Sequence, residues 1–208
     1  MNSFLGTYNI SLDDKGRFNV PAKFRNALEQ FGASDQVSLL VGKTLFRELG
    51  PVLTALLFAG RAGTSIAAEI GLMKATSQID AMQLMAIDPV QRIALPRFLA
   101  GLISVPLLTA MFNAFAILGA VVFSIGVMGL DPGIFWSKLQ TGIYFGKDFM
   151  GGFWKSVIFG GLVSLVAVYF GYYAKPTGEG VGTATTRTVV ISSVLVLVFD
   201  FIITSFLV

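Results

Sequence analysis

Four long apolar runs constrain this chain more than any other feature of its sequence. They lie at residues 45–70, 98–128, 153–173 and 188–208. A helix needs about 20 mainly apolar residues to cross the hydrocarbon core of a bilayer, and each run meets that length. Only 13% of the residues are charged, whereas soluble domains carry about 25%. The sequence therefore predicts an all-α, polytopic helical membrane protein with four recognisable transmembrane helices.

The residue types that are missing exclude several classes of chemistry. The chain contains neither Cys nor His, which excludes thiol and imidazole catalysis, disulfides and the usual zinc sites. The segment around Gly42-Lys43-Thr44 and the segment 178–183 each lack a glycine that a nucleotide-binding motif requires. We therefore predict no ATPase or other enzymatic activity, no cofactor and no metal. The N-terminal residues also lack the basic stretch followed by an apolar stretch that predicts a cleavable signal peptide.

Basic residues in the loops predict the orientation of the spans. The loops at 71–97 and 174–187 hold five Lys or Arg residues, and the loop at 129–152 holds two. Loops rich in Lys and Arg face the cytoplasm, so we expect the first and third loops on that side. With four spans, the charged N-terminal segment would then lie outside. Either this segment is translocated, or a further span belongs ahead of residue 45.

Residues 1–36 differ in character from the rest of the chain. They hold four basic and four acidic residues, and their pattern predicts a strand, a tight turn, a strand and a short helix. The segment DDKGRFNVPAKFR, within residues 6–33, resembles swapped-hairpin DNA-binding proteins of the MraZ and AbrB type. That resemblance implies a DNA-binding module. A short soluble extension, or sequence joined by accident to residues 37–208, is the interpretation we favour, so we expect no nucleic-acid partner.

Small residues recur at every fourth position of the first apolar run. Each step of four residues turns only about 40° around a helix, so these positions form one slowly drifting seam. Small residues on such a seam let another helix approach closely. The predicted helix-packing seam consists of Ala55, Ala59, Gly63, Ala67 and Gly71.

Charged residues in or beside the apolar runs are candidate functional groups, because charge inside a membrane is costly and faces a partner or a polar cavity. Arg47 and Glu48 precede Gly50-Pro51, where we expect the helix to break. These two residues could line the mouth of a lipid or ion path. Arg61 and Asp200 are intramembrane charges that either form an internal ion pair or act as the relay of an ion-coupled secondary transporter.

The segment 72–90 is too polar to span a membrane. One helical stripe is approximated by Leu72, Ile79, Met82, Met85 and Ala86, which predicts an amphipathic helix on the cytoplasmic side. Methionines suit an adaptable docking face. A short amphipathic helix can equally rest on the membrane surface, and both interpretations stay open at this point.

Three long segments resemble a known family. RELGPVLTALLFAGRAGTSIAAEIGLM at 47–73, QIDAMQLMAIDPVQRIALPRFLA at 78–100 and ATTRTVVISSVLVLVFDF at 184–201 closely resemble the MlaE family of ABC-transporter permeases. The resemblance extends over residues 37–208. It implies a homodimeric inner-membrane permease that moves phospholipids between the inner and outer membranes of Gram-negative bacteria and so maintains outer-membrane lipid asymmetry. The family has five spans preceded by an interfacial helix, whereas this sequence shows four.

The same resemblance implies partners and roles for particular residues. The partners would be a cytoplasmic ATPase of the MlaF type, a small regulatory subunit of the MlaB type and a periplasmic lipid-binding ring of the MlaD type. Arg47 and Glu48 would lie on the lipid path at the dimer centre. The segment 69–89 would be the coupling helix that seats in the ATPase, with the contact residues Glu69, Met82, Met85 and Asp88. A membrane-tethered DNA-binding regulator, acting through residues 1–36, is a further alternative.

Overall fold

The computed structural model describes residues 42–126, 132–142 and 145–207. Within these ranges every regular element is a helix, either α or the wider π form labelled η. The strands and short helix predicted within residues 1–36 lie outside the described residues. For the part of the chain that is described, the prediction of an all-α fold is confirmed.

The first span is one continuous helix that widens twice. It is built, in order, from η1 (Leu45–Leu49), α3 (Gly50–Phe58), η2 (Ala59–Gly63) and α4 (Thr64–Ala75). The predicted helix break at Gly50-Pro51 is wrong, because Gly50 keeps helical dihedrals (φ −56°, ψ −62°) and donates its N–H to the carbonyl of Leu45. Pro51 has no N–H with which to reach the carbonyl of Arg47. The hydrogen bonds here take the wider π pattern, from residue i to residue i−5. The helix therefore continues although one α-helical hydrogen bond is missing.

Three further spans follow. They are formed by η3 (Val90–Ala94) with α6 (Leu95–Gly126), by α8 (Met150–Tyr172) and by α9 (Gly178–Leu207). In the described part of the chain, four helical stretches are long and apolar enough to cross a membrane: Gly42–Ala75, Val90–Gly126, Met150–Tyr172 and Gly178–Phe206. This confirms a multi-pass membrane protein with four recognisable spans. Each span begins before its predicted first residue, because polar residues such as Gln91 and Thr183 continue the helix beyond the apolar run.

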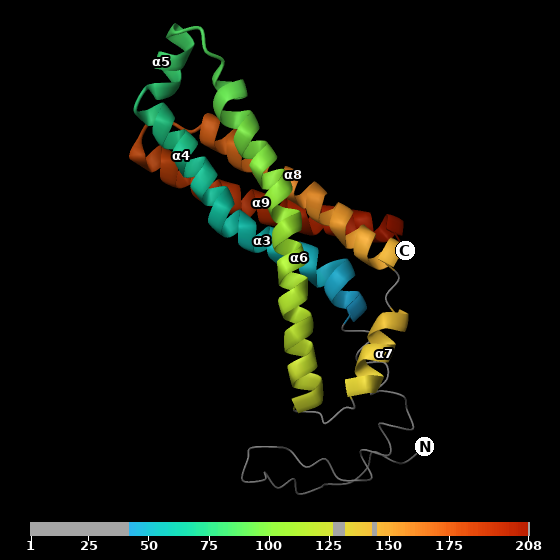
Figure 1. Cartoon of the computed structure of the whole chain (residues 1–208). Helices are drawn as coiled ribbons and strands as arrows, with labels where there is room; N and C mark the ends of the chain where they lie inside the picture. Colours follow the sequence, from blue (N-terminus) through green and yellow to red (C-terminus); the bar gives the residue numbers. More distant parts are fainter. Residues whose placement is uncertain (1–41, 127–131, 143–144, 208) are drawn as a thin grey trace, which may run out of the picture.

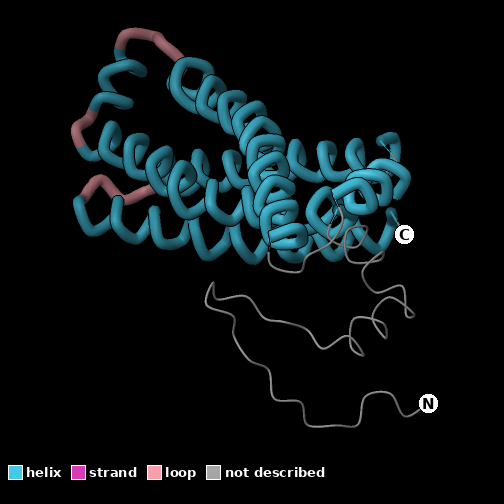
Figure 2. Tube along the Cα trace, turned by 60° about the horizontal axis from the view of Figure 1, so that its bottom comes forward, coloured by secondary structure: helices cyan, strands magenta, loops and turns pink. Residues whose placement is uncertain are grey.

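Helix α8 lies at the centre of the bundle. It contacts α3, α4, α6 and α9, and Figures 1 and 2 show α6 crossing the other long helices while α4, α8 and α9 run side by side. The main core is a cluster of apolar side chains from all four spans: Ala55, Phe58, Ala59, Val105, Phe159, Val163 and Val196. Charged residues stay out of this layer, as the hydrophobic effect and the cost of burying charge require.

Glycines allow α6 and α8 to approach closely. A Cβ atom added to Gly160 would lie 3.0 Å from the carbonyl oxygen of Gly101 and 3.1 Å from the Cβ atom of Val105. One added to Gly152 would collide with the carbonyl oxygen of Phe46 on η1. Backbone-to-backbone contacts of this kind are how membrane helices gain van der Waals attraction without a hydrophobic driving force between them.

The two ends of the bundle carry short helices. At one end α5 (Gln78–Leu84) lies between α4 and η3, bounded by Ser77 and Ala86, each with φ of 57°. The single amphipathic helix predicted over 72–90 is therefore wrong, because these two left-handed residues divide the segment. At the other end lie α7 (Pro132–Gly142) and η4 (Phe145–Phe149). Figure 1 shows α5 and α7 at opposite ends of the molecule.

Candidate functional site

A buried lysine on α8 joins three helices. The ammonium of Lys155 donates to both carboxylate oxygens of Glu48 (3.2 and 3.3 Å), to Asp200 Oδ1 (3.0 Å) and to Thr204 Oγ1 (2.7 Å). Glu48 lies on η1, and Asp200 and Thr204 lie one helical turn apart on α9. We call these four residues the lysine cluster. An ammonium has three N–H donors, and the three partner side chains use all of them.

The charges of the lysine cluster do not cancel. One lysine faces two carboxylates, so the formal charge of the group is negative when all three are ionised. The side chain of Lys155 is 4% exposed, whereas that of Glu48 is 35% exposed. Burying a charge is unfavourable unless it is paired and hydrogen-bonded. The cluster therefore has a closed side at the lysine and an open side at Glu48, where a polar group from outside the helix bundle can approach.

The structure corrects the pairing that the sequence suggested for Asp200. This carboxylate pairs with Lys155, and the predicted ion pair between Asp200 and Arg61 is wrong. Arg61 is exposed on η2 and forms no ion pair within the described residues. The sequence analysis did not single out Lys155, although a lysine inside the third apolar run was a visible signal.

Arg47 takes a different partner from its neighbour Glu48. Its Nε lies 3.7 Å from Asp148 Oδ1 on η4, and its side chain is 35% exposed whereas that of Asp148 is 4% exposed. Beside this pair, the rings of Phe46 and Phe149 meet edge to face, with their centroids 6.0 Å apart. The ion pair and the aromatic pair together hold η1 against η4, and they leave about a third of the Arg47 side chain exposed.

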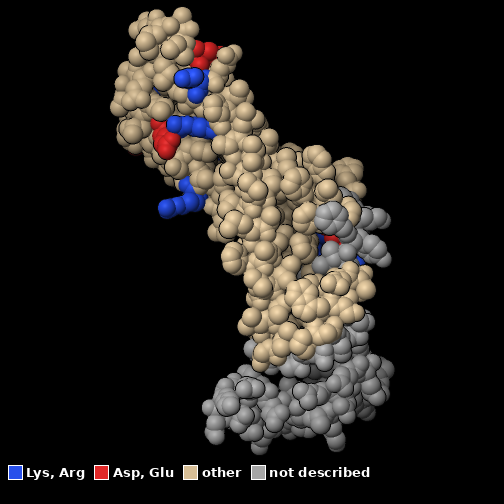
Figure 3. All heavy atoms as spheres, in the orientation of Figure 1, with Lys and Arg blue, Asp and Glu red and all other residues tan. Residues whose placement is uncertain are grey.

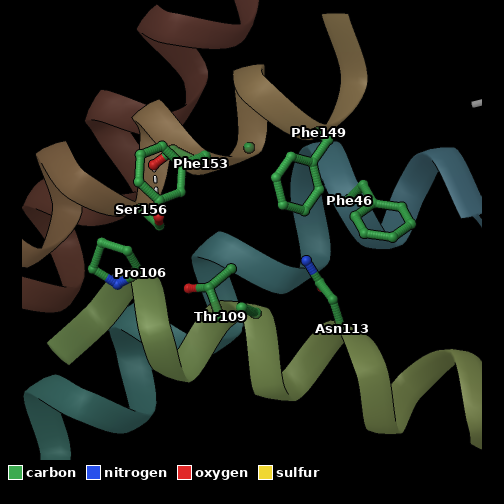
Figure 4. A pocket seen from close by; sticks show the side chains of 9 residues that line it. Phe46, Pro106, Thr109, Asn113, Phe149, Phe153 and Ser156 are labelled. Carbon is green, nitrogen blue, oxygen red and sulfur yellow. Dashed lines mark hydrogen bonds between the residues drawn. The ribbon is translucent and has the colours of Figure 1, made fainter. Parts of the chain in front are cut away.

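A pocket lies on the α6 side of the same region. Its walls come from η1, α6, η4 and α8, and they include the rings of Phe46, Phe149 and Phe153 and the amide of Asn113. Figure 4 shows Asn113 and Thr109 rising from α6 toward these rings. The pocket and the lysine cluster are thus both built around η1 and the start of α8, near the end that carries α7.

The predicted packing seam lies inside the bundle. All five of its residues are buried: Ala55, Ala59, Gly63, Ala67 and Gly71. A Cβ atom on Gly63 would lie 3.5 Å from Val163 on α8 and 3.6 Å from Thr188 on α9. One on Gly71 would lie 3.3 Å from Val181 on α9. The seam thus faces the two other helices that run alongside α4.

The residues predicted to contact an ATPase have different surroundings at the α5 end. Glu69 pairs with Arg97 (2.9 Å), and Met82 packs against the small core of Ile70, Ile79 and Ile93. Met85 is 64% exposed. Asp88 is exposed, and its Oδ1 accepts the N–H of Val90 (2.9 Å) at the start of η3. These residues lie on one end of the molecule, but only some of them face outward.

Leu84 is a residue of this end that the sequence analysis did not name. It is the last residue of α5 and is 89% exposed. Together with Met85 it forms an apolar tip beyond the spans. Figure 3 shows charged side chains gathered around α4, α5 and the start of α6, whereas the middle of this face carries almost none. An apolar tip within a charged end is a feature of surfaces that bind other proteins.

Comparison with known proteins places the chain in a family. The profile of the family described as Permease MlaE matches residues 20–206. The intermembrane phospholipid transport system permease protein MlaE of Haemophilus influenzae is 48% identical over 178 residues, which cover 86% of this chain and 68% of the relative. A probable ABC transporter permease protein of Rickettsia typhi is 37% identical over 179 residues, with the same coverage of 86% and 68%. The chloroplastic protein TRIGALACTOSYLDIACYLGLYCEROL 1 of Arabidopsis thaliana is 28% identical over 184 residues, 88% of this chain and 52% of the relative. This chain belongs to the MlaE permease family.

Proposed function

We propose that this chain is the membrane-spanning subunit of an ABC transporter that moves phospholipids between the inner and outer membranes of a Gram-negative bacterium. The observation that carries the proposal is the family match over residues 20–206, combined with 48% identity to a phospholipid transport permease. The chain itself would sit in the inner membrane and perform no catalysis. ATP hydrolysis would come from a separate cytoplasmic ATPase.

The charged residues at the start of the first span supply a path for the lipid head group. Arg47 pairs with Asp148, and its side chain is 35% exposed. A guanidinium is well suited to bind a phosphate through two parallel hydrogen bonds. Glu48 presents the open side of the lysine cluster. We infer that a phospholipid passes this point with its phosphate near Arg47.

The α5 end supplies the surface for the ATPase. Leu84 and Met85 are exposed beyond the membrane-spanning part of the chain, and α5 is tied to the bundle through Ile79 and Met82. A force applied to α5 would therefore reach α4, η3 and α8 through packed side chains. The further proposed partners are a second copy of this chain, a small regulatory subunit of the MlaB type and a periplasmic lipid-binding ring of the MlaD type.

The first prediction tests the lipid path with two arginines of the same span. Arg47→Ala should lower the amount of phospholipid recovered with the purified transporter severalfold, because it removes the proposed phosphate ligand. Arg61→Ala is the matched control, since Arg61 is exposed and lies apart from both charged groups. Lipid is quantified by mass spectrometry after purification in detergent. Equal recovery from both variants would contradict the role of Arg47.

The second prediction tests the coupling surface. Asp88 has two properties, a negative charge and a hydrogen bond to the N–H of Val90. Asp88→Asn keeps an acceptor for that bond, whereas Asp88→Lys reverses the charge and removes it. We expect Asp88→Lys to lower ATP hydrolysis by the assembled complex at least tenfold and Asp88→Asn to have a smaller effect. Normal assembly and normal ATP hydrolysis in the Asp88→Lys variant would show that Asp88 does not belong to the proposed interface.

A further inference from the structure

Glu48 keeps hydrogen-bonding capacity on the open side of the lysine cluster. An ionised carboxylate has about four lone-pair sites. Among the described residues, two donors reach Glu48: the ammonium of Lys155, at 3.2 and 3.3 Å from the two carboxylate oxygens, and the hydroxyl of Thr204, at 3.3 and 3.4 Å. Each donor is shared between the two oxygens, so about half of the acceptor sites are unused. The side chain of Glu48 is 35% exposed, so a further N–H donor from outside the helix bundle can reach it.

The charge of the site selects the kind of donor. The lysine cluster holds one cation and two carboxylates, and the neighbouring pair of Arg47 with Asp148 is neutral. These groups together therefore carry one net negative charge when all of them are ionised. A cation at Glu48 offsets that charge, whereas an anion adds to it, and both effects grow where water is scarce. The donor that suits Glu48 is thus a cationic N–H group such as a primary ammonium.

Arg47 and Glu48 both pair with the helix formed by η4 and α8, which follow each other without a break. The partner of Arg47 is Asp148, and that of Glu48 is Lys155. Seven residues separate these partners, which is almost two full turns, so they lie on one face of that helix and about 10 Å apart along it. A phosphate at Arg47 and an ammonium at Glu48 therefore belong to one molecule if a short linker joins them. In an ethanolamine phospholipid, the ester oxygen and two carbon atoms form that linker.

We infer that Glu48 binds the ammonium of a zwitterionic phospholipid whose phosphate lies at Arg47, and that the transporter therefore prefers ethanolamine head groups to anionic glycerol head groups. This inference rests on the proposed transport of phospholipids, and it names the head group that the path accepts. Lys155 and Thr204 are positioning residues, because their hydrogen bonds hold the carboxylate of Glu48. An anionic lipid meets the same arginine, but it supplies no cation for Glu48 and adds a second net negative charge to the site.

The test compares two lipids that share the phosphate and differ in the group attached to it. The complete transporter is reconstituted in bilayers with equal amounts of phosphatidylethanolamine and phosphatidylglycerol that carry identical acyl chains. It is then purified again in detergent, and the two bound lipids are quantified by mass spectrometry. Wild-type protein should retain about two to five times more phosphatidylethanolamine, the ratio expected for a partly exposed ion pair.

Two variants separate a contact at Glu48 from the charge of the lysine cluster as a whole. Glu48→Gln should bring the ratio to about one, because it removes the charge that pairs with the ammonium and keeps a side chain of similar size. Asp200→Asn removes one negative charge from the same cluster, but the side chain of Asp200 is only 19% exposed and pairs with Lys155. Its ratio should therefore stay clearly above that of Glu48→Gln.

Three outcomes would overturn the head-group site. They are equal retention of both lipids by wild-type protein, an unchanged ratio in Glu48→Gln, and an equal loss of preference in the two variants. The wild-type measurement decides the question even if a variant fails to fold. Recovery of no phospholipid at all would overturn the proposed function together with the site, whereas equal recovery of both lipids would reject the site alone.

Discussion

Lys155 is the residue whose replacement should affect stability most. In Lys155→Met the carboxylates of Glu48 and Asp200 would face each other without a cation, and removing one partner from a buried ion pair costs about 3–5 kcal/mol. Because Glu48 is partly exposed, we expect the free energy of unfolding to fall by an amount near the lower end of this range, about 3 kcal/mol. Thermal unfolding in detergent measures it. The triple variant Lys155→Met, Glu48→Gln, Asp200→Asn removes the whole set of charges and should recover most of the lost stability.

The roles of single residues could be predicted only in part. Arg47, Glu48 and Asp200 stand out in the sequence because a charge in an apolar run always requires an explanation. Which residues they pair with could not be predicted, because pairing depends on how three helices are rotated about their axes. Lys155 lies close to the predicted start of its span, where a long lysine side chain ordinarily reaches the membrane surface. Packing against η1 and α9 instead directs it inward.

Two glycines of α6 provide a test of helix packing. A Cβ atom on Gly101 would meet the side chain of Ser164, with the two Cβ atoms 2.9 Å apart, whereas one on Gly119 meets nothing within 4 Å. Gly101→Ala should therefore destabilise the bundle by about 1–3 kcal/mol. Gly119→Ala should stabilise it by up to about 1 kcal/mol, because alanine is the better helix former. Unfolding of both variants in the same detergent gives the comparison, and equal stabilities would contradict close packing of α6 on α8.

The helices could be predicted from the sequence wherever amino-acid composition alone determines where they lie. The four spans follow from apolar length, and so does a helical segment between the first two that is too polar to span the membrane. The division of that segment at Ser77 and Ala86, which makes α5 a separate helix, was not predicted. The sequence could not distinguish a helix break at Pro51 from a π turn, because both accommodate a proline. The neighbours decide between them: the packing of Phe46 and Gly50 against α8 and α6 holds the chain helical on either side of Pro51.

The orientation of the whole molecule is open to a direct test. The chain has no native cysteine, so a thiol reagent can label it only at a cysteine that is introduced. Gln83 on α5, Thr177 before α9 and Gln140 on α7 are exposed. With the α5 end in the cytoplasm, a membrane-impermeant thiol reagent added to intact spheroplasts should label Gln140→Cys and spare Gln83→Cys and Thr177→Cys. Permeabilised cells should label all three. Labelling of Gln83→Cys in intact spheroplasts would show that the molecule has the opposite orientation.

At the scale of the whole chain, the sequence predicted the class and the family correctly, and the family match confirms the latter. The crossing of α6 over the other spans was not predictable, because apolar composition does not specify which helix faces which. The division of the chain after residue 36, and the DNA-binding resemblance ahead of it, stay predictions, since those residues lie outside the described ranges.

The lysine cluster has a consequence for how the chain is made. An aspartate near the centre of a span raises the free energy of insertion by about 2.5–3.5 kcal/mol on biological scales, and Asp200 lies in the span formed by α9. Its cation, Lys155, belongs to the span synthesised just before it. Helix α9 therefore enters the lipid most readily when α8, which is synthesised before it, is still beside the insertion machinery, so that these two spans insert as a pair.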